Sequence, residues 1–368
     1  MKKVVHIITG LNQGGAESVL YKICNETQKD FSFIVISLKG KGFFSEKLRL
    51  LQIPVYEINL RNIFFLPISF FRLYNLIKKE KPDIVQTWMY HADFFGGIVA
   101  KIVGIKLIIW NIRGPLNTKK TNLQTHILAR FCAIISRWVP NKIICCSEFA
   151  SKVHIGIGYF SDKFIIIPNG YKIPEKYGVN KLSLIKSGSD FILGMIARYD
   201  PYKDHKSLLK ALRIVKQNGY SFKCLLAGSG IDTKNQKLLS LIKSLNLYDN
   251  VELLGVISDV NQLFSRIDLH VLSSIDEAFP NVIAESMAMG VPIVSTNVGD
   301  AALIAGDLGW IVNPSDPNSI AIGIIEAILE KDKPEWKIRK EKSRERIVKY
   351  FSIEKMCKQY SNLWNNNL

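Results

Sequence analysis

Two glutamates, Glu277 and Glu285, lie in the segment of the chain that offers the most chemistry. They follow an apolar stretch, Leu269–Leu272, that reads as a buried strand, and the pattern predicts a helix that starts near Pro280 and is capped by Gly290. Glu277 would lie in the loop before this helix and Glu285 about one turn inside it. Unpaired N–H groups at a helix N-terminus suit a phosphate, and carboxylates beside them can accept hydrogen bonds from hydroxyl groups. The same pattern is also typical of a capping acid and a solvated glutamate.

Two cations, Arg198 and Lys203, follow another predicted strand, Phe191–Ile196. Arginine supplies a planar fork of donors and lysine a point charge, so the two together suit a diphosphate. Either residue alone would more often be an ordinary surface side chain.

A third candidate is the glycine loop Gly14-Gly15, which follows the predicted strand Val4–Thr9 and precedes a helix from about Ala16. Glycine lets the backbone approach a ligand closely, and the helix presents its N-terminus to that ligand. The loop lacks the G-x-G-x-x-G spacing of a dinucleotide site, so a nicotinamide cofactor is not supported.

Apolar strands alternate with helix-length segments along the chain, which predicts parallel sheets covered on both faces. The strands expected first are Val4–Thr9, Phe33–Ser37, Ile84–Thr87, Leu107–Trp110, Ile143–Cys146 and Phe164–Ile167. After a polar linker at 171–189 the pattern restarts, with strands at Phe191–Ile196, Phe222–Ala227, Val251–Leu254, Leu269–Leu272 and Ile293–Ser295. Residues 316–350 read as helical, Phe351-Ser352 as a kink, and Ile353–Trp364 as one more helix.

The fold class is therefore α/β, with two Rossmann-like domains at 1–172 and 190–350. They are expected to face each other across a cleft, because ligands of such sheets bind at the carboxyl ends of the strands. The length of 368 residues also favours two domains over one.

The charge of the chain is unevenly distributed. Of the net +17, an excess of 14 positive charges lies at or before Lys172, where 24 Lys and Arg stand against 10 Asp and Glu. This asymmetry suggests an anionic partner, either nucleic acid or anionic lipid, although a generally lysine-rich composition would also produce it. The six cysteines form no CxxC pair or zinc-ligand spacing, so we expect reduced core thiols and no metal. The chain start shows no secretory signal, and its apolar run is too short to span a bilayer.

Taken together, these segments resemble glycosyltransferase family 4. The resemblance rests on the Glu277-x7-Glu285 spacing, Gly290-x-Pro292, Arg198 with Lys203, Gly14-Gly15-Ala16-Glu17 and Ile167-Pro-Asn-Gly170. It implies a GT-B fold whose last helix, 352–368, crosses back to the N-terminal domain. It also implies transfer of a sugar from a nucleotide-diphosphate donor, and a UDP-linked sugar is the donor we favour. The anomeric configuration would be retained, and no metal or other cofactor would be needed.

The resemblance also implies roles for individual residues. In the C-terminal, nucleotide-sugar-binding domain, Arg198 and Lys203 would neutralise the diphosphate, Glu285 would bind ribose hydroxyls, and Glu277 would contact the transferred sugar. The remaining positions implied for the sugar donor are Gly15, Phe279, Pro280, Asn281 and Val282. In the N-terminal, acceptor-binding domain, His91 would lie near the transferred sugar and Arg113 would face the acceptor.

One position departs from the family pattern, because Ala278 replaces the glycine that many members have after the first glutamate. Retaining enzymes of this type have no agreed nucleophile, so Glu277 is not assigned that role. The expected path is front-face, with a leaving phosphate oxygen accepting the proton of the acceptor.

The family often extends lipid-linked oligosaccharides for bacterial surface polysaccharides, which predicts a lipid-linked or glycan acceptor and a cytoplasmic enzyme peripheral on the membrane. Basic residues beside apolar ones in the first half suit an anionic membrane surface. They are Arg61, Arg72, Lys78, Lys79 and Lys81 beside Phe64, Phe65, Phe70 and Phe71, and Lys119, Lys120, Arg130 and Arg137 beside Ile127, Phe131, Ile134 and Trp138. The alternative is that these apolar faces pack on the sheet.

Two other functions fit parts of the sequence. A nucleotide-sugar 2-epimerase shares the GT-B fold, but the Glu277-x7-Glu285 spacing and the basic first domain argue against it. A nucleic-acid partner is motivated by charge alone, and no helix-turn-helix, zinc-finger or RNP-like motif supports it.

Overall fold

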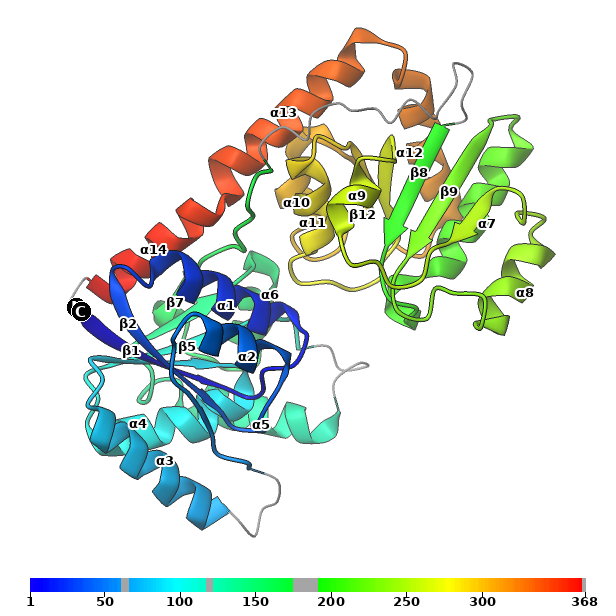
Figure 1. The fold of residues 1–368 in the computed structure, drawn as a ribbon. Helices are drawn as coiled ribbons and strands as arrows, with labels where there is room; N and C mark the ends of the chain where they lie inside the picture. The colour runs from blue at the N-terminus through cyan, green and yellow to red at the C-terminus, as the bar shows by residue number, and fades with distance from the viewer. Residues whose placement is uncertain (61–65, 117–121, 175–190, 366–368) are drawn as a thin grey trace. The chain divides into compact units, whose positions relative to one another are not determined.

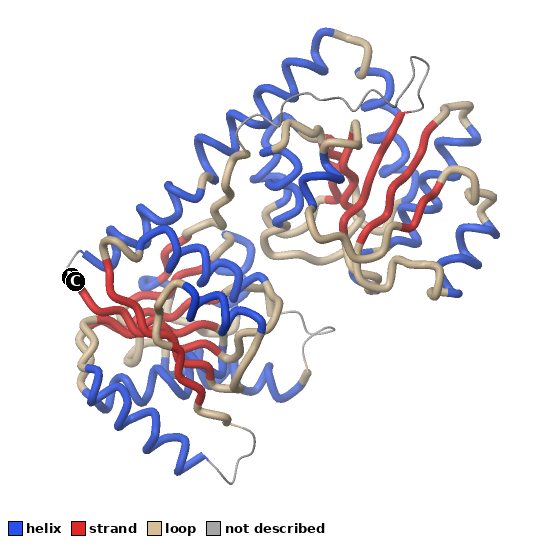
Figure 2. Tube along the Cα trace, viewed as in Figure 1, coloured by secondary structure: helices blue, strands red, loops and turns tan. Residues whose placement is uncertain are grey.

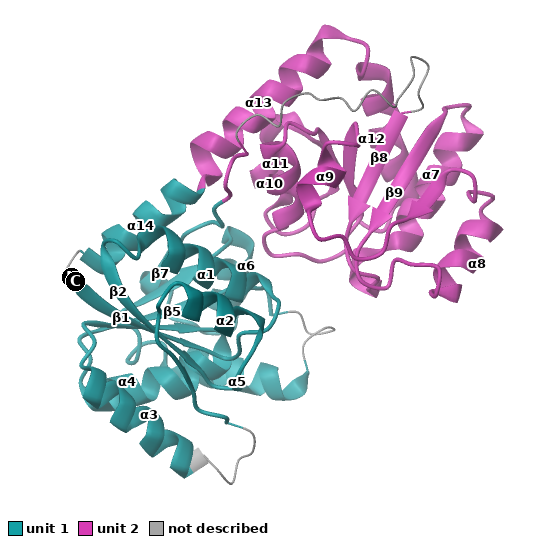
Figure 3. Ribbon diagram, viewed as in Figure 1, with its two compact units in different colours: residues 1–170, 353–368 teal, residues 171–352 magenta. Residues whose placement is uncertain are grey.

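The computed structural model describes residues 1–60, 66–116, 122–174 and 191–365. The chain divides into two compact units (Figure 3), each built on its own parallel sheet. Unit 1 comprises Met1–Gly170 with Ile353–Leu368, and unit 2 comprises Tyr171–Ser352.

The sheet of unit 1 has seven strands in the order β3-β2-β1-β4-β5-β6-β7, and all the pairs along it are parallel. The chain reverses its direction of winding between β1 and β4, where α/β sheets of this kind bind ligands. The strands are β1 (Lys2–Ile8), β2 (Phe31–Ser37), β3 (Val55–Glu57), β4 (Ile84–Trp88), β5 (Leu107–Ile112), β6 (Lys142–Cys145) and β7 (Phe164–Ile166).

Helices cover both faces of this sheet (Figures 1 and 2). One face carries α1 (Gly15–Thr27), α2 (Phe43–Leu50) and the returning helix α14 (Ile353–Asn365). The other face carries α3 (Leu66–Glu80), the π-helix η2 (Ala92–Gly96), α4 (Gly97–Val103) and α5 (Leu123–Ile135). A further helix, α6 (Glu148–Gly156), and the 3₁₀ turn η3 (Ser161–Lys163) lie between β6 and β7 in sequence.

The C-terminal helix α14 is part of the core of unit 1. Its Trp364 is fully buried against Phe31 and Phe33, and the indole Nε1–H donates to Gln86 Oε1 at 2.9 Å. Tyr360 stacks on a tryptophan of β4 and accepts a hydrogen bond from Asn111 Nδ2 at 2.8 Å. The predicted return of the last helix to the N-terminal domain is confirmed.

Unit 2 repeats the architecture with six strands in the order β10-β9-β8-β11-β12-β13, again with parallel pairs. The strands are β8 (Phe191–Ile196), β9 (Phe222–Ala227), β10 (Val251–Leu253), β11 (Leu269–Leu272), β12 (Ile293–Thr296) and β13 (Trp310–Val312). One face is covered by α7 (His205–Gln217), α8 (Gln236–Ser244) and α12 (Pro317–Glu330). The other carries α9 (Val260–Phe264), α10 (Asn281–Ala288) and α11 (Ala301–Ala305), with α13 (Pro334–Phe351) packed on α10.

Several boundaries differ from the prediction. Residues 316–350 do not form one helical segment, because Pro334 cannot continue a helix and starts α13 after a three-residue break. The edge strands β3 and β13, of three residues each, and the helices α2, α6 and α11 were not predicted. The kink is confirmed, since Ser352 is extended (φ −71°, ψ 155°) between α13 and α14.

All six cysteines are free and buried, as expected for reduced core thiols. Among the described helices, none combines the length and apolar character that crossing a bilayer would require.

Removing the Trp364 side chain should destabilise unit 1 selectively. Trp364→Ala would leave a large cavity and an unpaired Gln86 carbonyl, and loss of a buried Trp costs about 3–5 kcal/mol. Hydrogen exchange should speed up in β1, β2 and β4 but not in unit 2. Leu50→Ala, at a side chain that is 83% exposed, is the matched control and should change neither unit. Equal acceleration in both units would contradict the assignment of α14 to unit 1.

Candidate functional site

In unit 2, the loops after the neighbouring strands β8 and β11 bring Lys203 and Glu277 into contact. Lys203 Nζ and Glu277 Oε1 form an ion pair, and the two side chains are only 20% and 17% exposed. The hydroxyl of Ser274 donates to the same carboxylate oxygen at 2.9 Å. The two charges, 74 positions apart in sequence, thus form one partly buried cluster at the carboxyl end of the sheet.

Lys203 is held by a short turn between two capping aspartates. Asp200 accepts from the amide of Tyr202 at 2.9 Å and so starts the 3₁₀ turn η4 (Pro201–Lys203). Asp204 has left-handed backbone (φ 45°), and its side chain caps α7 through the amide of Ser207 at 3.1 Å. Because Ser273 Oγ also donates to the carbonyl of Lys203 at 2.8 Å, both strand ends fix the position of the lysine.

Arg198 lies in the same loop but points to solvent. Its side chain is 57% exposed and pairs with Asp200 Oδ2 at 3.0 Å rather than with Glu277. The backbone beneath it is packed against Gly228, which follows β9 with φ 145°. A Cβ at residue 228 would overlap the carbonyl of Ala197 and lie 2.9 Å from the nitrogen of Arg198. Gly228 therefore allows the backbone of the loop that carries Arg198 to pack closely against the end of β9.

The helix α10 begins at the predicted position, directly after Pro280. Pro280 is its N-cap, with extended ψ of 93°, so the first helical residue is Asn281. The side chain of Asn281 is already engaged, because its Oδ1 accepts from the hydroxyl of Tyr171 at 2.5 Å. Phe279 is buried against Phe351, with ring centroids 5.8 Å apart. Gly290 ends the helix in left-handed conformation (φ 69°), as predicted.

Glu285 lies half-buried one turn inside α10, and Val282 packs on the neighbouring apolar cluster. The loop that carries Glu277 is supported from behind by Gly299, which follows β12 with φ 52°. A Cβ there would overlap the carbonyls of Glu277 and Ala278, and the amide of Asp300 donates to the carbonyl of Ala278 at 2.9 Å.

Gly228 and Gly299 were missed by the sequence analysis. The signal was present, because Gly228-Ser-Gly230 and Asn297-Val-Gly299 follow two of the predicted strands directly. These glycines matter because they let the backbone pack closely against the loops of Arg198 and Glu277. This packing follows from the order of the strands in the sheet, which the sequence analysis did not have.

In unit 1, Gly15, His91 and Arg113 follow the three adjacent strands β1, β4 and β5. Gly15 is the first residue of α1, and its N-cap Gly14 supplies no side chain. The carboxylate of Glu17 folds back over Gly14, and burial raises the pKa of Glu17. The Glu17 carboxylate also accepts a hydrogen bond from its own backbone amide, so this acidic side chain partly covers the start of the helix.

His91 follows a strained turn at the end of β4. Met89 has left-handed backbone (φ 72°), which is unfavourable for a non-glycine residue, and the π-helix η2 starts directly after His91. π-turns within helices occur frequently at functional sites. The pKa of His91 is lowered, first by loss of hydration and then by the positive charge of Lys39. Both effects favour the neutral form of the imidazole.

Arg113 is half-buried and held by two asparagines. Its guanidinium donates to Asn169 Oδ1 and more weakly to Asn111 Oδ1 at 3.5 Å, and it lies 5.8 Å from the ring centroid of Trp88. Asn169 belongs to the Pro168-Asn-Gly170 segment noted in the sequence. Arg113 is thus a fixed positive charge at the carboxyl end of β5.

The residues predicted to meet a membrane are only partly described. Arg61, Phe64, Phe65, Lys119 and Lys120 lie outside the described residues. On α3 the basic side chains of Arg72, Lys78 and Lys79 are exposed, as is Phe71, whereas Phe70 is half-buried and contacts Phe95. On α5 the predicted apolar residues are exposed rather than packed on the sheet.

The described residues contain no group of three or more His, Cys, Asp or Glu side chains that could hold a metal ion. The polar groups described above are the ion pairs Lys203–Glu277 and Arg198–Asp200, the guanidinium of Arg113, the imidazole of His91 and the N-termini of α1 and α10.

Two Rossmann-like units, each built on a parallel sheet, define the GT-B fold. Solved structures of that fold cover nearly the whole chain. They include a glycosyltransferase of Rickettsia africae (TM-score 0.83, 20% identity, 100% of this chain and 98% of that one). Another is Alr3699/HepE of Anabaena in complex with UDP (TM-score 0.85, 21% identity, covering 98% of this chain and 99% of that one).

Sequence comparison narrows the class to a family. Residues 13–173 match the model of Glycosyltransferase Family 4, and residues 180–350 match that of Glycosyl transferases group 1. A Campylobacter jejuni relative is 31% identical over 90% of this chain and 92% of its own length. It is the N-acetylgalactosamine-N,N'-diacetylbacillosaminyl-diphospho-undecaprenol 4-alpha-N-acetylgalactosaminyltransferase. The capsular polysaccharide biosynthesis glycosyltransferase CapM of Staphylococcus aureus is 27% identical, with 82% and 81% covered. The chain belongs to glycosyltransferase family 4 and is a glycosyltransferase.

Adding one methyl group at Gly228 should displace the Arg198 loop. If the donor is UDP-linked, as proposed below, Gly228→Ala should weaken UDP binding at least about tenfold, because the loop must shift to relieve overlap with Ala197. Gly219→Ala is the matched control, since Gly219 also has positive φ (84°) but nothing within 4 Å of its added Cβ. Titration calorimetry with UDP checks the difference. Equal losses in the two variants would show that backbone strain, rather than loop displacement, is responsible.

Proposed function

We propose that this protein is a retaining glycosyltransferase that moves a sugar from a UDP-linked donor to a lipid-linked acceptor. The pathway would be synthesis of a bacterial surface polysaccharide: O-antigen, capsule or glycoprotein glycan. The observation that carries the proposal is the partly buried Lys203–Glu277 pair at the edge where α10 begins. A cation and a carboxylate held together there match a ligand that has both phosphates and sugar hydroxyls.

The diphosphate would be held without a metal ion or other cofactor. Lys203 would turn from Glu277 to the β-phosphate, and Arg198, whose side chain is exposed, would close on the same group. Two cations and the N-terminus of α10 would stabilise the charge that develops as the glycosidic bond breaks. They would thereby do what a bound metal does elsewhere.

The sugar and ribose hydroxyls would be bound by the two glutamates. When Lys203 moves to the phosphate, Glu277 becomes able to accept hydrogen bonds from the transferred sugar. Glu285, one turn further along α10, lies where it would reach the ribose. The backbone around Phe279, Pro280, Asn281 and Val282 would complete this side of the site.

Unit 1 would supply the acceptor side. A neutral His91 can donate to or accept from a hydroxyl of the transferred sugar, and Gly15 would let the backbone approach the phosphates once the Glu17 carboxylate has moved aside. Arg113 would meet the diphosphate of the acceptor. In the front-face path the acceptor oxygen bonds to the anomeric carbon as the carbon–phosphate-oxygen bond breaks, and that phosphate oxygen takes the acceptor proton.

The relatives support the choice of substrates. The Escherichia coli relative at 24% identity is a UDP-Gal:alpha-D-GlcNAc-diphosphoundecaprenol alpha-1,3-galactosyltransferase, and the Campylobacter relative also acts on a diphospho-undecaprenol. Such acceptors stay in the membrane, so the enzyme would work at its cytoplasmic face, bound peripherally.

A donor screen followed by product analysis tests this function. A nucleotide sugar at 100 times its Kd should stabilise the protein by about 2.7 kcal/mol, which thermal shift detects. With that donor and a polyprenyl diphosphate glycan, NMR of the product should show the anomeric configuration of the donor, with or without EDTA. An inverted product, or a donor epimerised without acceptor, would contradict the proposal.

Lys203→Ala should lower kcat far more than Tyr202→Ala. The lysine would stabilise the leaving diphosphate, and removing one such charged donor costs about 10²–10³-fold. Tyr202 lies in the same turn, and its backbone amide, which the substitution keeps, donates the capping hydrogen bond to Asp200. Tyr202→Ala therefore controls for damage to the loop. Steady-state kinetics with saturating donor measures both. Equal effects would remove Lys203 from the phosphate site.

A further inference from the structure

The helix α5 is built with its small residues inside and its large apolar residues outside. Its buried residues are Ala129, Cys132 and Ala133. A surface helix normally buries its large apolar side chains and shows polar ones to water. The reversal on α5 leaves a continuous apolar surface exposed.

This surface, here named the α5 stripe, comprises Leu123, Ile127, Phe131, Ile134 and Trp138. The spacing of four, four and three residues places Leu123, Ile127, Phe131 and Ile134 on one face of α5, and Trp138 follows in the turn after the helix. At 1.5 Å per residue the helical part of the stripe, from Leu123 to Ile134, is about 17 Å long. Leu123, Phe131 and Trp138 are 74%, 52% and 62% exposed, so most of their apolar area is left in water. A contiguous apolar patch of this kind marks an interaction surface.

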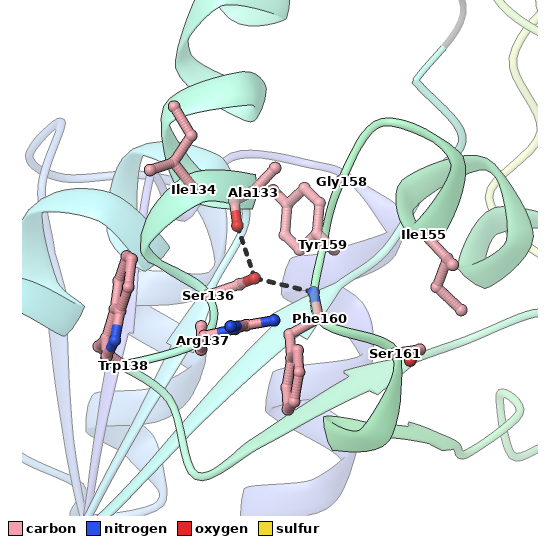
Figure 4. A pocket seen from close by; sticks show the side chains of 10 residues that line it. All are labelled: Ala133, Ile134, Ser136, Arg137, Trp138, Ile155, Gly158, Tyr159, Phe160 and Ser161. Atoms are coloured by element: carbon pink, nitrogen blue, oxygen red, sulfur yellow. Dashed lines mark hydrogen bonds between the residues drawn. The ribbon is translucent and has the colours of Figure 1, made fainter.

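A pocket of about 380 Å³ continues the stripe beyond the end of α5 (Figure 4). Ile134, Trp138 and Ile155 bring their apolar side chains to it, and Tyr159 and Phe160 form part of its wall. The guanidinium of Arg137 lies 4.9 Å from the ring centroid of Phe160, so a positive charge stands at this apolar hollow.

The charge around the stripe has a single sign over a long stretch of chain. From Phe94 to Ser147 the sequence has eight Lys and Arg and no Asp or Glu. Arg130 and Arg137 are exposed beside the stripe. At the far end, burial lowers the pKa of Lys163, and the charges of Lys101 and Lys142 lower it further, so cations are crowded there. The acid nearest this pocket in sequence is Asp162, next to its lining residue Ser161.

A row of exposed apolar side chains flanked by cations fits a lipid surface better than it fits nucleic acid or a second copy of this chain. Nucleic acid would meet the cations with its phosphates, but it offers nothing to cover five exposed apolar side chains. A second copy would bring the same positive charge to the same face, at a net +17 per chain. An anionic bilayer satisfies both features, because acyl chains take the apolar side chains and headgroups take the arginines.

We propose that the α5 stripe and its pocket form the membrane-docking surface of the protein, inserted at the boundary between headgroups and acyl chains of an anionic bilayer. The inference rests on the proposed function only in supposing that the acceptor is lipid-linked. α5 follows β5, whose carboxyl end carries Arg113, so the docked stripe belongs to the same segment as the acceptor-side cation.

The tryptophans allow a direct test on the full chain. Trp138 is the exposed one of the six, whereas Trp88, Trp110, Trp336 and Trp364 are buried and Trp310 is half-buried. With vesicles of equal phosphatidylglycerol and phosphatidylcholine that carry brominated acyl chains, fluorescence should be quenched. Trp138→Phe should bind equally well and lose the quenching. Binding without quenching of the wild type would overturn the proposal.

Point changes on the stripe should weaken the docking without affecting the fold. Phe131→Ser and Ile127→Ser should each lower vesicle partitioning about tenfold, because insertion of each side chain removes its apolar area from water. Leu50→Ser, on α2 and also highly exposed, is the matched control and should bind like the wild type. Partitioning should be lost on pure phosphatidylcholine.

Two further results would overturn the docking surface while leaving the proposed function intact. One is a wild type that does not bind anionic vesicles, although it transfers sugar to a water-soluble diphosphate acceptor. The other is a dimer by light scattering that Phe131→Ser dissociates, since a second copy would then cover the stripe. Absence of transfer to the soluble acceptor, with vesicle binding and Trp138 quenching present, would count against the proposed function and support the docking.

Discussion

The ion pair between Lys203 and Glu277 is the interaction on which the candidate site depends, because it joins the loops of two adjacent strands. Both side chains are largely buried, so removing either partner would leave the other charge poorly hydrated. Within the proposed function, a diphosphate is the anion that can replace Glu277 beside Lys203. Binding of the sugar donor then exchanges one charge partner for another, and the displaced carboxylate becomes available to hydroxyl groups. The pair keeps the lysine aimed at the strand ends before a ligand arrives.

That pair is positioned by unusual backbone rather than by long side chains. Gly228 packs on the carbonyl of Ala197, next to Arg198, and Gly299 packs on the carbonyl of Glu277. Asp204 adopts a left-handed backbone conformation, and its side chain caps α7. In unit 1, Met89 plays the corresponding part before His91. Each device costs conformational free energy, and each lies at the carboxyl end of a strand, where ligands bind in such sheets. The sites are therefore set by loops that the sheets hold rigidly.

Much of this could be predicted from the sequence, since long apolar runs specify their own strands. β8, β9 and β11 were predicted to the residue, whereas the edge strands β3 and β13 were missed although the equally short edge strands β7 and β10 were found. The split at Pro334 was missed because charge and helical composition continue across it. Candidate residues followed from their places after strands. The pairing of Lys203 with Glu277, and of Arg198 with Asp200 instead, depends on strand order and turn geometry, which one sequence does not encode in readable form.

The helix α5 is a second case in which the sequence alone could not decide how side chains are placed. Its sequence is apolar around most of its circumference, so periodicity could not decide which face is buried, and packing on the sheet was a reasonable expectation. In the structure the fully buried residues of α5 are Ala129, Cys132 and Ala133, on a helix that packs on η2. The bulky side chains of the stripe are left exposed. Their exposure would lower solubility unless a surface covered them, and the absence of acidic residues over the same stretch points to an anionic one. Under the docking proposed above, the bilayer that holds the lipid-linked acceptor would also cover these side chains.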